Sequence, residues 1–328
     1  MDPSFLQHIF KIHSDREFEE LALEVFRFQA RENKVYSKYL GLVGINPYSI
    51  DSLAQIPFLP IEIFKYHKVL TGDKPPRIVF ESSGTAGTGV SKHYVVDPDL
   101  YHKSLNQCFN LFYQSPENYS ILALLPSYLE RDNSSLVYMA EQLIQQSHHD
   151  SSGFYLDNYS SLNKILLSSE KNKTPAILLG VSFALVEFAQ QFPVPLNHTI
   201  VIETGGMKGK REEMTRDALH SLLKDSFKTG EIHSEYGMTE LLSQAYSSGE
   251  GIFRSPPWMK ILIRDIHDPF NYLDDNISGG INIIDLANVW SCSFISTQDI
   301  GKTLPGGGFE VLGRFDHSDL RGCNLMIE

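Results

Sequence analysis

The sequence has few cysteines, no block of positive charge and no long apolar run, and each absence excludes a class of protein. Its three cysteines, Cys108, Cys292 and Cys323, are an odd and widely spaced set, so neither a disulfide framework nor a zinc site is expected. The net charge of −12 and the lack of a basic cluster argue against a nucleic-acid partner. Apolar runs such as residues 121–125 are too short to cross a bilayer, so no membrane insertion is expected.

The first residues also lack the pattern of a secretory signal, because no basic stretch precedes an apolar core. The cytoplasm is therefore the expected compartment. With 42% hydrophobic and 21% charged residues in a chain of 328, the composition is that of a folded protein with a large core.

Strand-like and helical patterns alternate through the middle of the chain, after a predicted helix over residues 14–40. The strands are expected over 120–125, 176–180, 198–203 and 232–236, and the helices over 134–146, 181–191 and 211–227. This alternation predicts an α/β protein with helices on both faces of a sheet. Short β-like segments then follow over 259–264, 280–285 and 289–296, which indicates a small β-rich subdomain at about 251–312.

A loop rich in glycine and hydroxyl residues follows the strand-like run Ile78-Val79-Phe80. Glycines let backbone N–H groups turn toward a ligand, hydroxyls add donors, and a lysine supplies a point charge for a polyphosphate. The loop is not of the Walker A type, because no Gly-Lys-Ser/Thr opens a helix here. The candidate phosphate-binding residues are Ser82, Ser83, Gly84, Thr85, Gly87 and Lys92.

Two further segments sit at predicted strand ends, where ligands of α/β sheets tend to bind. One is Thr204-Gly205-Gly206 and the other is Tyr236-Gly237-Met238-Thr239-Glu240. An aromatic ring can stack on a purine, a hydroxyl can touch a phosphate, and a carboxylate can hold Mg²⁺ between nucleotide phosphates. The alternatives are that Tyr236 is a core aromatic and Glu240 a first-turn helix carboxylate.

Two more segments lie near the end of the sequence, Thr297-Gln298-Asp299-Ile300-Gly301 and Gly313-Arg314-Phe315-Asp316. Asp299 could cap a turn, and Arg314 could pair with Asp316 at the surface.

In this order, the five segments resemble the motifs of the acyl-adenylate-forming superfamily. The resemblance covers about residues 56–328. It implies the fold of the large N-terminal domain of such enzymes, without their mobile C-terminal domain, and it implies ATP and Mg²⁺ as cofactors. In the family the segment matching Gly205 and Gly206 packs against adenine, and the aspartate matching Asp299 binds the ribose hydroxyls.

A narrower resemblance rests on residues 58–65, 125–131 and 318–325, which are similar to segments of bacterial acyl-protein synthetases of the LuxE type. These enzymes activate a fatty acid with ATP and then carry it as a thioester on a cysteine near the C-terminus. Cys323 matches that cysteine. The resemblance implies a carboxylic acid substrate, and an acyl-accepting reductase or acyltransferase as a partner protein.

The sequence departs from the superfamily in the phosphate loop, which reads Thr-Gly-Val-Ser-Lys over 88–92 in place of x-Pro-Lys. Two alternatives stay open: a phenylacetate-type coenzyme A ligase, and an acyl- or nucleotide-binding subunit without turnover. We expect one adenylate-forming domain over 1–312 and a short tail over 313–328 that carries Cys323. The expected catalytic residues are Cys323, Lys92, Glu240 and Arg314.

Overall fold

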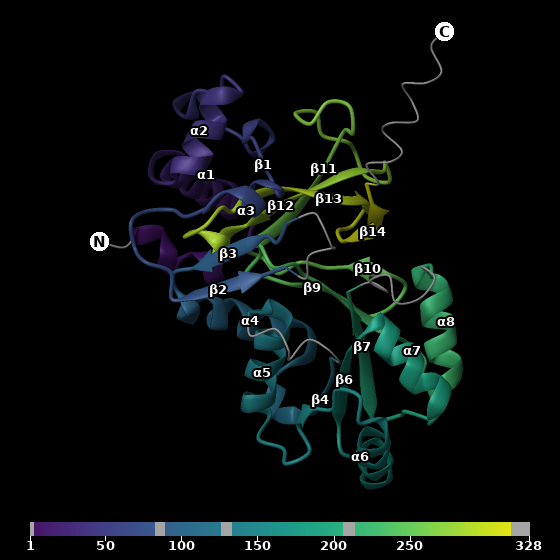
Figure 1. Ribbon diagram of the computed structural model, residues 1–328. Coiled ribbons are helices and arrows are strands. Elements are labelled where there is room, and N and C mark those ends of the chain that lie inside the picture. The colour runs from purple at the N-terminus through teal and green to yellow at the C-terminus, as the bar shows by residue number, and fades with distance from the viewer. Residues whose placement is uncertain (1–2, 83–88, 126–132, 206–213, 316–328) are drawn as a thin grey trace. The chain divides into compact units, whose positions relative to one another are not determined.

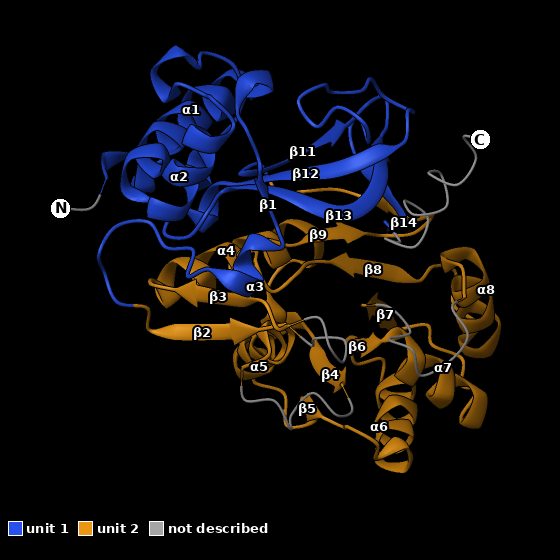
Figure 2. Cartoon of the chain, turned by 45° about the horizontal axis from the view of Figure 1, so that its top comes forward, with its two compact units in different colours: residues 1–75, 257–328 blue, residues 76–256 orange. Residues whose placement is uncertain are grey.

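The computed structural model describes residues 3–82, 89–125, 133–205 and 214–315 (Figure 1). The chain divides into two compact units (Figure 2). Unit 1 combines residues 1–75 with 257–328, and unit 2 is continuous from residue 76 to 256. Most of the expected β-rich segment thus shares a unit with the first 75 residues. The separate tail over 313–328 stays a prediction, since residues 316–328 are not described.

Unit 2 alternates strands and helices, as the sequence predicted. Its elements in chain order are β2 (Ile78–Glu81), β3 (Lys92–Val95), α4 (Pro98–Tyr113), β4 (Ser120–Leu124), α5 (Ser135–Ser147), β5 (Gly153–Phe154), α6 (Tyr159–Asn172), β6 (Ala176–Val181), α7 (Ser182–Gln191), β7 (Thr199–Thr204), α8 (Arg216–Phe227), β8 (His233–Tyr236), β9 (Ala245–Ser247) and β10 (Ile252–Phe253). The larger sheet has the order β5-β4-β6-β7-β8-β9, and β2 pairs with β3 in a separate hairpin. Strands β5 to β8 are parallel to their neighbours, and β9 runs antiparallel to β8.

Helices cover both faces of this sheet, which confirms the prediction. Strands β4 and β6 are buried over their whole length, as expected of parallel strands that have helices on both sides. Successive side chains of β7 point to opposite faces. Ile202 lines a small cavity with Phe109 of α4 and Leu143 of α5, whereas Glu203 faces His220 of α8.

Unit 1 joins N-terminal helices to an antiparallel sheet. Its elements are α1 (Asp15–Glu32), α2 (Lys34–Leu42), β1 (Leu59–Pro60), α3 (Ile63–Tyr66), β11 (Met259–Arg264), β12 (Gly279–Asp285), β13 (Phe294–Thr303) and β14 (Phe309–Arg314). Within this unit the strand order is β14-β13-β12-β11, and β1 pairs in parallel with β13. Within the described ranges, no helix combines the length and the apolar composition needed to span a bilayer.

The single helix predicted over 14–40 is wrong, because the structure breaks it at Asn33. The side-chain oxygen of Asn33 accepts hydrogen bonds from the backbone N–H groups of Val35 (3.1 Å) and Tyr36 (3.0 Å), and so caps α2. Its amide donates to the carbonyl of Ser291 (2.7 Å). Asn33 therefore begins a new helix and at the same time ties it to a distant segment.

One predicted helix start also differs from the structure. Helix α1 begins at Asp15, directly after its capping residue Ser14, close to the predicted start. Helix α8 begins at Arg216, after the capping residue Thr215, and not at Arg211. In both cases a hydroxyl accepts a hydrogen bond from a first-turn N–H, which fixes where the helix can begin.

The strand predicted over 289–296 begins only at Phe294. A buried glutamine of α1 forms hydrogen bonds with the backbone groups of residues 289–293, which are therefore not free to pair with another strand. Gln29 is fully buried; its amide donates to the carbonyl of Val289 (2.9 Å), and its oxygen accepts from the N–H of Ser293 (2.9 Å). Asn288 in turn donates to the carbonyl of Cys292 (2.9 Å). These bonds hold residues 289–293 as a compact turn.

Candidate functional site

The predicted phosphate loop connects β2 to β3, and two hydrogen bonds hold its base. Ser82 donates its N–H to the carbonyl of Ser91 (3.0 Å), and the Ser82 hydroxyl accepts from the N–H of Ser91 (3.0 Å). A strand thus precedes the loop, as predicted, and a second strand follows it. The remaining loop candidates lie outside the described residues: Ser83, Gly84, Thr85 and Gly87.

Lys92 is the first residue of β3 and lies directly across the hairpin from Glu81. Its Nζ is 2.8 Å from Oε1 of Glu81, and both side chains are partly exposed. The hydrogen bond and the charge of Glu81 raise the pKa of Lys92. The ammonium is therefore charged and is paired with Glu81 at the end of the loop.

The Tyr236–Glu240 segment leaves the end of β8 and forms a turn, not a helix, so the interpretation of Glu240 as a helix-start carboxylate is wrong. Glu240 is buried, with 5% of its surface exposed. Tyr236 is half-buried and its ring packs edge-to-face on Phe253, with ring centroids 5.8 Å apart. The aromatic and the carboxylate are thus both held at the carboxyl end of a sheet strand.

A buried histidine ties this turn to the β2–β3 hairpin. Nδ1 of His93 lies 2.8 Å from the carbonyl oxygen of Thr239, and since a carbonyl can only accept, Nδ1 carries the proton. His93 follows Lys92 in β3 and is 1% exposed. The structure therefore brings together two motifs that are about 150 residues apart. Sequence reasoning missed His93, although its place beside the predicted lysine was a usable signal.

Strand β7 ends beside β8, and Gly205 follows directly after it, at the strand end that the sequence predicted. Gly205 has φ of 65°, a left-handed conformation that favours glycine, and its carbonyl accepts a hydrogen bond from the hydroxyl of Ser182 (2.5 Å). Gly206 lies outside the described residues. Gly205 is therefore held by the first residue of α7.

Two buried carboxyl groups near these strand ends were not predicted. Oε2 of Glu203 of β7 lies 3.1 Å from the same Ser182 hydroxyl oxygen, and its Oε1 lies 3.6 Å from Nε2 of His220 and 3.8 Å from Nε of Arg216. A glutamate inside the apolar run of β7 was the sequence signal, because a buried carboxylate requires partners. Helices α7 and α8 supply these partners.

Glu235 of β8 is the second carboxyl group, and it points to the opposite face from Glu203. Its partner is Thr204, whose hydroxyl donates to Oε2. Burial raises the pKa of Glu235 to about 7; the Thr204 hydrogen bond opposes this shift and the charge of Glu203 adds to it. The two carboxyl groups thus occupy different charge environments at one edge of the sheet.

In unit 1, Asp299 of β13 and Arg314 of β14 are cross-strand neighbours, and Nε of Arg314 lies 2.8 Å from Oδ1 of Asp299. The Asp299 side chain is 6% exposed, and that of Arg314 is 74% exposed. Asp299 lies within a strand, so the alternative of a turn cap is wrong. The two predicted residues meet each other, and Asp316 lies outside the described residues.

A second arginine, Arg264 of β11, supports this part of the sheet. Nη1 donates to the carbonyl of Ile281 (2.8 Å) and to Oδ1 of Asn282 (2.9 Å), and Nη2 donates to the carbonyl of Thr297 (2.7 Å). Burial lowers the pKa of Arg264 from its ordinary value. The guanidinium therefore holds the backbone two residues before Asp299.

Neither of the cysteines that the structure describes offers an accessible thiol. Cys108 and Cys292 are fully buried, and burial raises the pKa of Cys292 to about 12. Cys323 lies outside the described residues. Over the four described ranges, no cluster of three or more His, Cys, Asp or Glu side chains could hold a metal ion. A single carboxylate such as Glu240 still fits a Mg²⁺ whose remaining ligands are phosphates and water.

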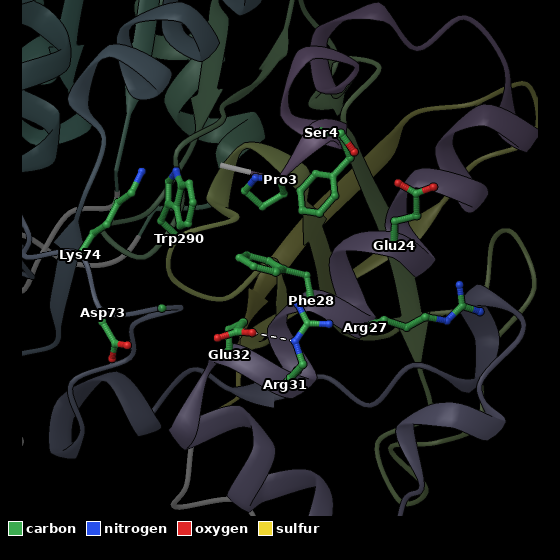
Figure 3. Close-up of a pocket in the computed structure, with 12 residues that line it drawn as sticks. Pro3, Ser4, Glu24, Arg27, Phe28, Arg31, Glu32, Asp73, Lys74 and Trp290 are labelled. Atoms are coloured by element: carbon green, nitrogen blue, oxygen red, sulfur yellow. Dashed lines mark hydrogen bonds and ion pairs between the residues drawn. The ribbon is translucent and has the colours of Figure 1, made fainter. Parts of the chain in front are cut away.

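A cavity of about 590 Å³ in unit 1 contains none of the predicted residues (Figure 3). Phe28 and Trp290 pack edge-to-face in it, and Nζ of Lys74 lies 4.6 Å from the centre of the Trp290 ring. The charged lining residues balance one another: Glu24, Glu32 and Asp73 against Arg27, Arg31 and Lys74. This balance gives no electrostatic preference for a polyphosphate.

No protein-family model matches this sequence, and no curated protein matches it either. Solved structures do match. 2-Hydroxyisobutyryl-CoA ligase in the postadenylation state, in complex with R3-HIB-AMP, superposes with a TM-score of 0.67 and 8% identity, over 94% of this chain and 70% of that chain. ATP-bound MatB from Rhodopseudomonas palustris gives a TM-score of 0.55 and 15% identity, over 72% of this chain and 47% of that one.

O-succinylbenzoate coenzyme A synthetase (MenE) from Bacillus subtilis, in complex with ATP and magnesium ion, gives a TM-score of 0.51 and 16% identity, over 72% of this chain and 49% of that one. The match thus spans 47% to 49% of the length of the MatB and MenE chains. These likenesses show the fold, which resembles that of the N-terminal domain of adenylate-forming ligases, as the sequence predicted.

Proposed function

We propose that this protein activates a carboxylic acid, expected to be a fatty acid, with ATP and then transfers the acyl group to a protein thiol in the cytoplasm. The observation that carries the proposal is the contact between two motifs of unit 2, in which His93, next to Lys92, holds the Tyr236–Glu240 turn at Thr239. Further support comes from structures with a similar fold that contain ATP or an acyl adenylate.

In the first step a carboxylate oxygen attacks the α-phosphorus of ATP, and pyrophosphate leaves. The acyl group becomes a mixed anhydride with AMP, so the reaction mainly needs alignment and neutralisation of charge. We assign phosphate binding to the loop 82–92, with Lys92 leaving Glu81 for a phosphate oxygen. Mg²⁺ held at Glu240 would neutralise part of the phosphate charge.

The nucleoside is assigned to the other predicted residues. Tyr236 offers a half-buried aromatic face for adenine, and Gly205 gives a backbone that a ring can approach closely. Asp299, whose charge is balanced by Arg314, is assigned to the ribose hydroxyls. In this proposal Arg314 orients Asp299.

In the second step a thiolate attacks the carbonyl carbon of the acyl adenylate, AMP leaves, and a thioester forms. We assign this thiol to Cys323. Both cysteines in the described part of the chain are fully buried, which argues against Cys108 and Cys292 as acceptors. The thioester would then pass to a reductase or an acyltransferase.

The test is intact-protein mass spectrometry after incubation with ATP, Mg²⁺ and a panel of carboxylic acids. Wild type and a Cys292→Ala control should both gain an acyl mass that hydroxylamine removes, and Cys323→Ser should not. An adduct that persists in Cys323→Ser would exclude that cysteine.

The matching structures include coenzyme A ligases, so coenzyme A is the competing acceptor. AMP that appears only when coenzyme A is added, with no adduct on the protein, would support a coenzyme A ligase of the phenylacetate type. Absence of both AMP and adduct, while ATP still binds, would support a subunit without turnover.

A further inference from the structure

The carboxyl group of Glu235 on β8 bonds to the last residue of the neighbouring strand β7. Glu235 and Thr204 are directly paired on the parallel strands β8 and β7, so their side chains share one face of the sheet. The Thr204 hydroxyl donates to Oε2 of Glu235. Thr204 immediately precedes Gly205, and Glu235 immediately precedes Tyr236, so this one bond joins the end of β7 to the start of the Tyr236–Glu240 turn.

The other carboxyl oxygen of Glu235, Oε1, explains why residue 237 is a glycine. A Cβ atom on Gly237 would collide with Oε1 of Glu235, whereas every other neighbour of that Cβ would lie at 3.5 Å or more. The backbone at Gly237 does not have a positive φ, so its conformation does not require glycine. The carboxyl of Glu235 alone therefore excludes a side chain at position 237.

Glu235 has little freedom to move away. Its side chain is buried, with 9% of its surface exposed; Tyr246 of β9 is its cross-strand partner, and its charge also acts on Tyr113 of α4. From β7 it meets Thr204, and the charge of Glu203 acts on it from the same strand. The side chain is thus held by groups from three neighbouring elements.

We infer that Glu235 is a positioning residue, which presses against Gly237 and bonds to Thr204 and so fixes the Tyr236–Glu240 turn relative to the end of β7. The inference rests on the proposed function, because its value to the protein lies in placing Tyr236 and Glu240 for ATP. Glu235 itself need not touch the nucleotide. It acts through the backbone of Gly237.

The first test is a double-mutant cycle measured by ATP–pyrophosphate exchange. With Glu235 present, Gly237→Ala should raise KM for ATP by about tenfold, because the methyl group displaces the turn. In a Glu235→Ala background the same methyl has room, so the further change should be less than about twofold. Equal tenfold losses in both backgrounds would overturn the inference.

Two further variants separate positioning from general structure. Gly230→Ala is the matched control, because Gly230 lies in the same unit, has no atom within 4 Å of its Cβ position and has no positive φ; it should leave KM unchanged. Glu235→Gln keeps the shape and an acceptor for Thr204. In wild type we expect ATP–pyrophosphate exchange to fall from about pH 6.5 toward about pH 8, because the Glu235 carboxyl ionises over this range. Glu235→Gln cannot ionise, so it should retain exchange at about pH 6.5 and show no such decline. A pH profile identical to that of wild type would count against the inference.

The same cycle measured by urea unfolding needs no enzymatic activity. Gly237→Ala should destabilise wild type and leave Glu235→Ala nearly unchanged. If wild type gives no pyrophosphate exchange with any acid, the proposed function fails, and the unfolding cycle still decides whether Glu235 and Gly237 are coupled. Additive effects on unfolding would refute the coupling even in an active enzyme.

Discussion

The buried carboxyl of Glu235 predicts a stability difference that depends on pH. Burial raises its pKa in the folded chain to about 7, from an ordinary value of 4.5. When the pKa of a carboxyl is higher in the folded than in the unfolded state, proton binding stabilises the folded state. The gain is complete at a pH below the unfolded-state pKa, and it is lost as the pH rises through the folded-state pKa. A shift of this size corresponds to about 3 kcal/mol in total, at 1.36 kcal/mol for each pH unit.

Part of that total falls within an accessible pH range. At about pH 5.5 the unfolded chain has mostly released this proton and the folded chain still holds it, which favours folding by about 2 kcal/mol. At about pH 8 both states are ionised and the gain has disappeared. Glu235→Gln cannot ionise, so its free energy of unfolding should lack this component.

The assay is urea unfolding of wild type and Glu235→Gln at both pH values, comparing the difference between the two proteins. In the difference between the two free energies of unfolding, the contributions of the other titrating groups cancel. This difference should change by about 2 kcal/mol between the two pH values, with wild type losing stability relative to the variant as the pH rises. Glu250→Gln, at an exposed carboxylate of the same unit, should follow wild type. A change of less than about 0.5 kcal/mol would refute the argument that burial keeps Glu235 protonated.

Two further predictions concern one residue in each unit. Lys92→Met should reduce ATP–pyrophosphate exchange by about 100-fold and leave urea unfolding nearly unchanged, because its ion pair is exposed to solvent. Glu81→Gln breaks the same ion pair but keeps the lysine, so it should retain exchange. Equal losses of exchange in both variants would contradict the assignment of Lys92. Gln29→Leu should lower the free energy of unfolding by about 2–4 kcal/mol, because the Val289 carbonyl and the Ser293 N–H lose their buried partner, and unfolding like that of wild type would contradict this.

The sequence predicted β4, β6 and β7 of unit 2 well, because each is a short apolar run, and it missed β3, β5, β9 and β10. It predicted helix boundaries less well where a single polar residue decides them. Asn33 lies within an apolar helical pattern, and its role depends on the Ser291 carbonyl, 258 residues further along the chain. Residues 289–293 look like a strand, and only the amide of Gln29 shows why they turn. Such partners are set by tertiary contacts that a local pattern does not contain.

The candidate site shows the same division. Composition and strand-end position pointed to the segments around Lys92, Gly205 and Tyr236, and resemblance to a superfamily motif pointed to Asp299. The contacts among them were not predictable, since the pairing of Lys92 with Glu81 depends on hairpin register and that of Asp299 with Arg314 on a register shift between β13 and β14. Glu235 lies just before the Tyr236–Glu240 segment, and the sequence alone does not show its burial, which depends on β7, β9 and α4 packing around it.

The division of unit 1 between the two ends of the chain has a consequence for synthesis on the ribosome. Residues 76–256 are contiguous and contain every partner of their own sheet, so they can fold while translation continues. Helices α1 and α2 emerge first but must wait for β13, their packing surface, and for Ser291, the partner of Asn33. At bacterial-like elongation rates that wait lasts on the order of 10–50 s. During it the apolar face of α1, including Phe18 and Phe26, stays uncovered, which marks the nascent N-terminus as the segment that a chaperone would have to shield.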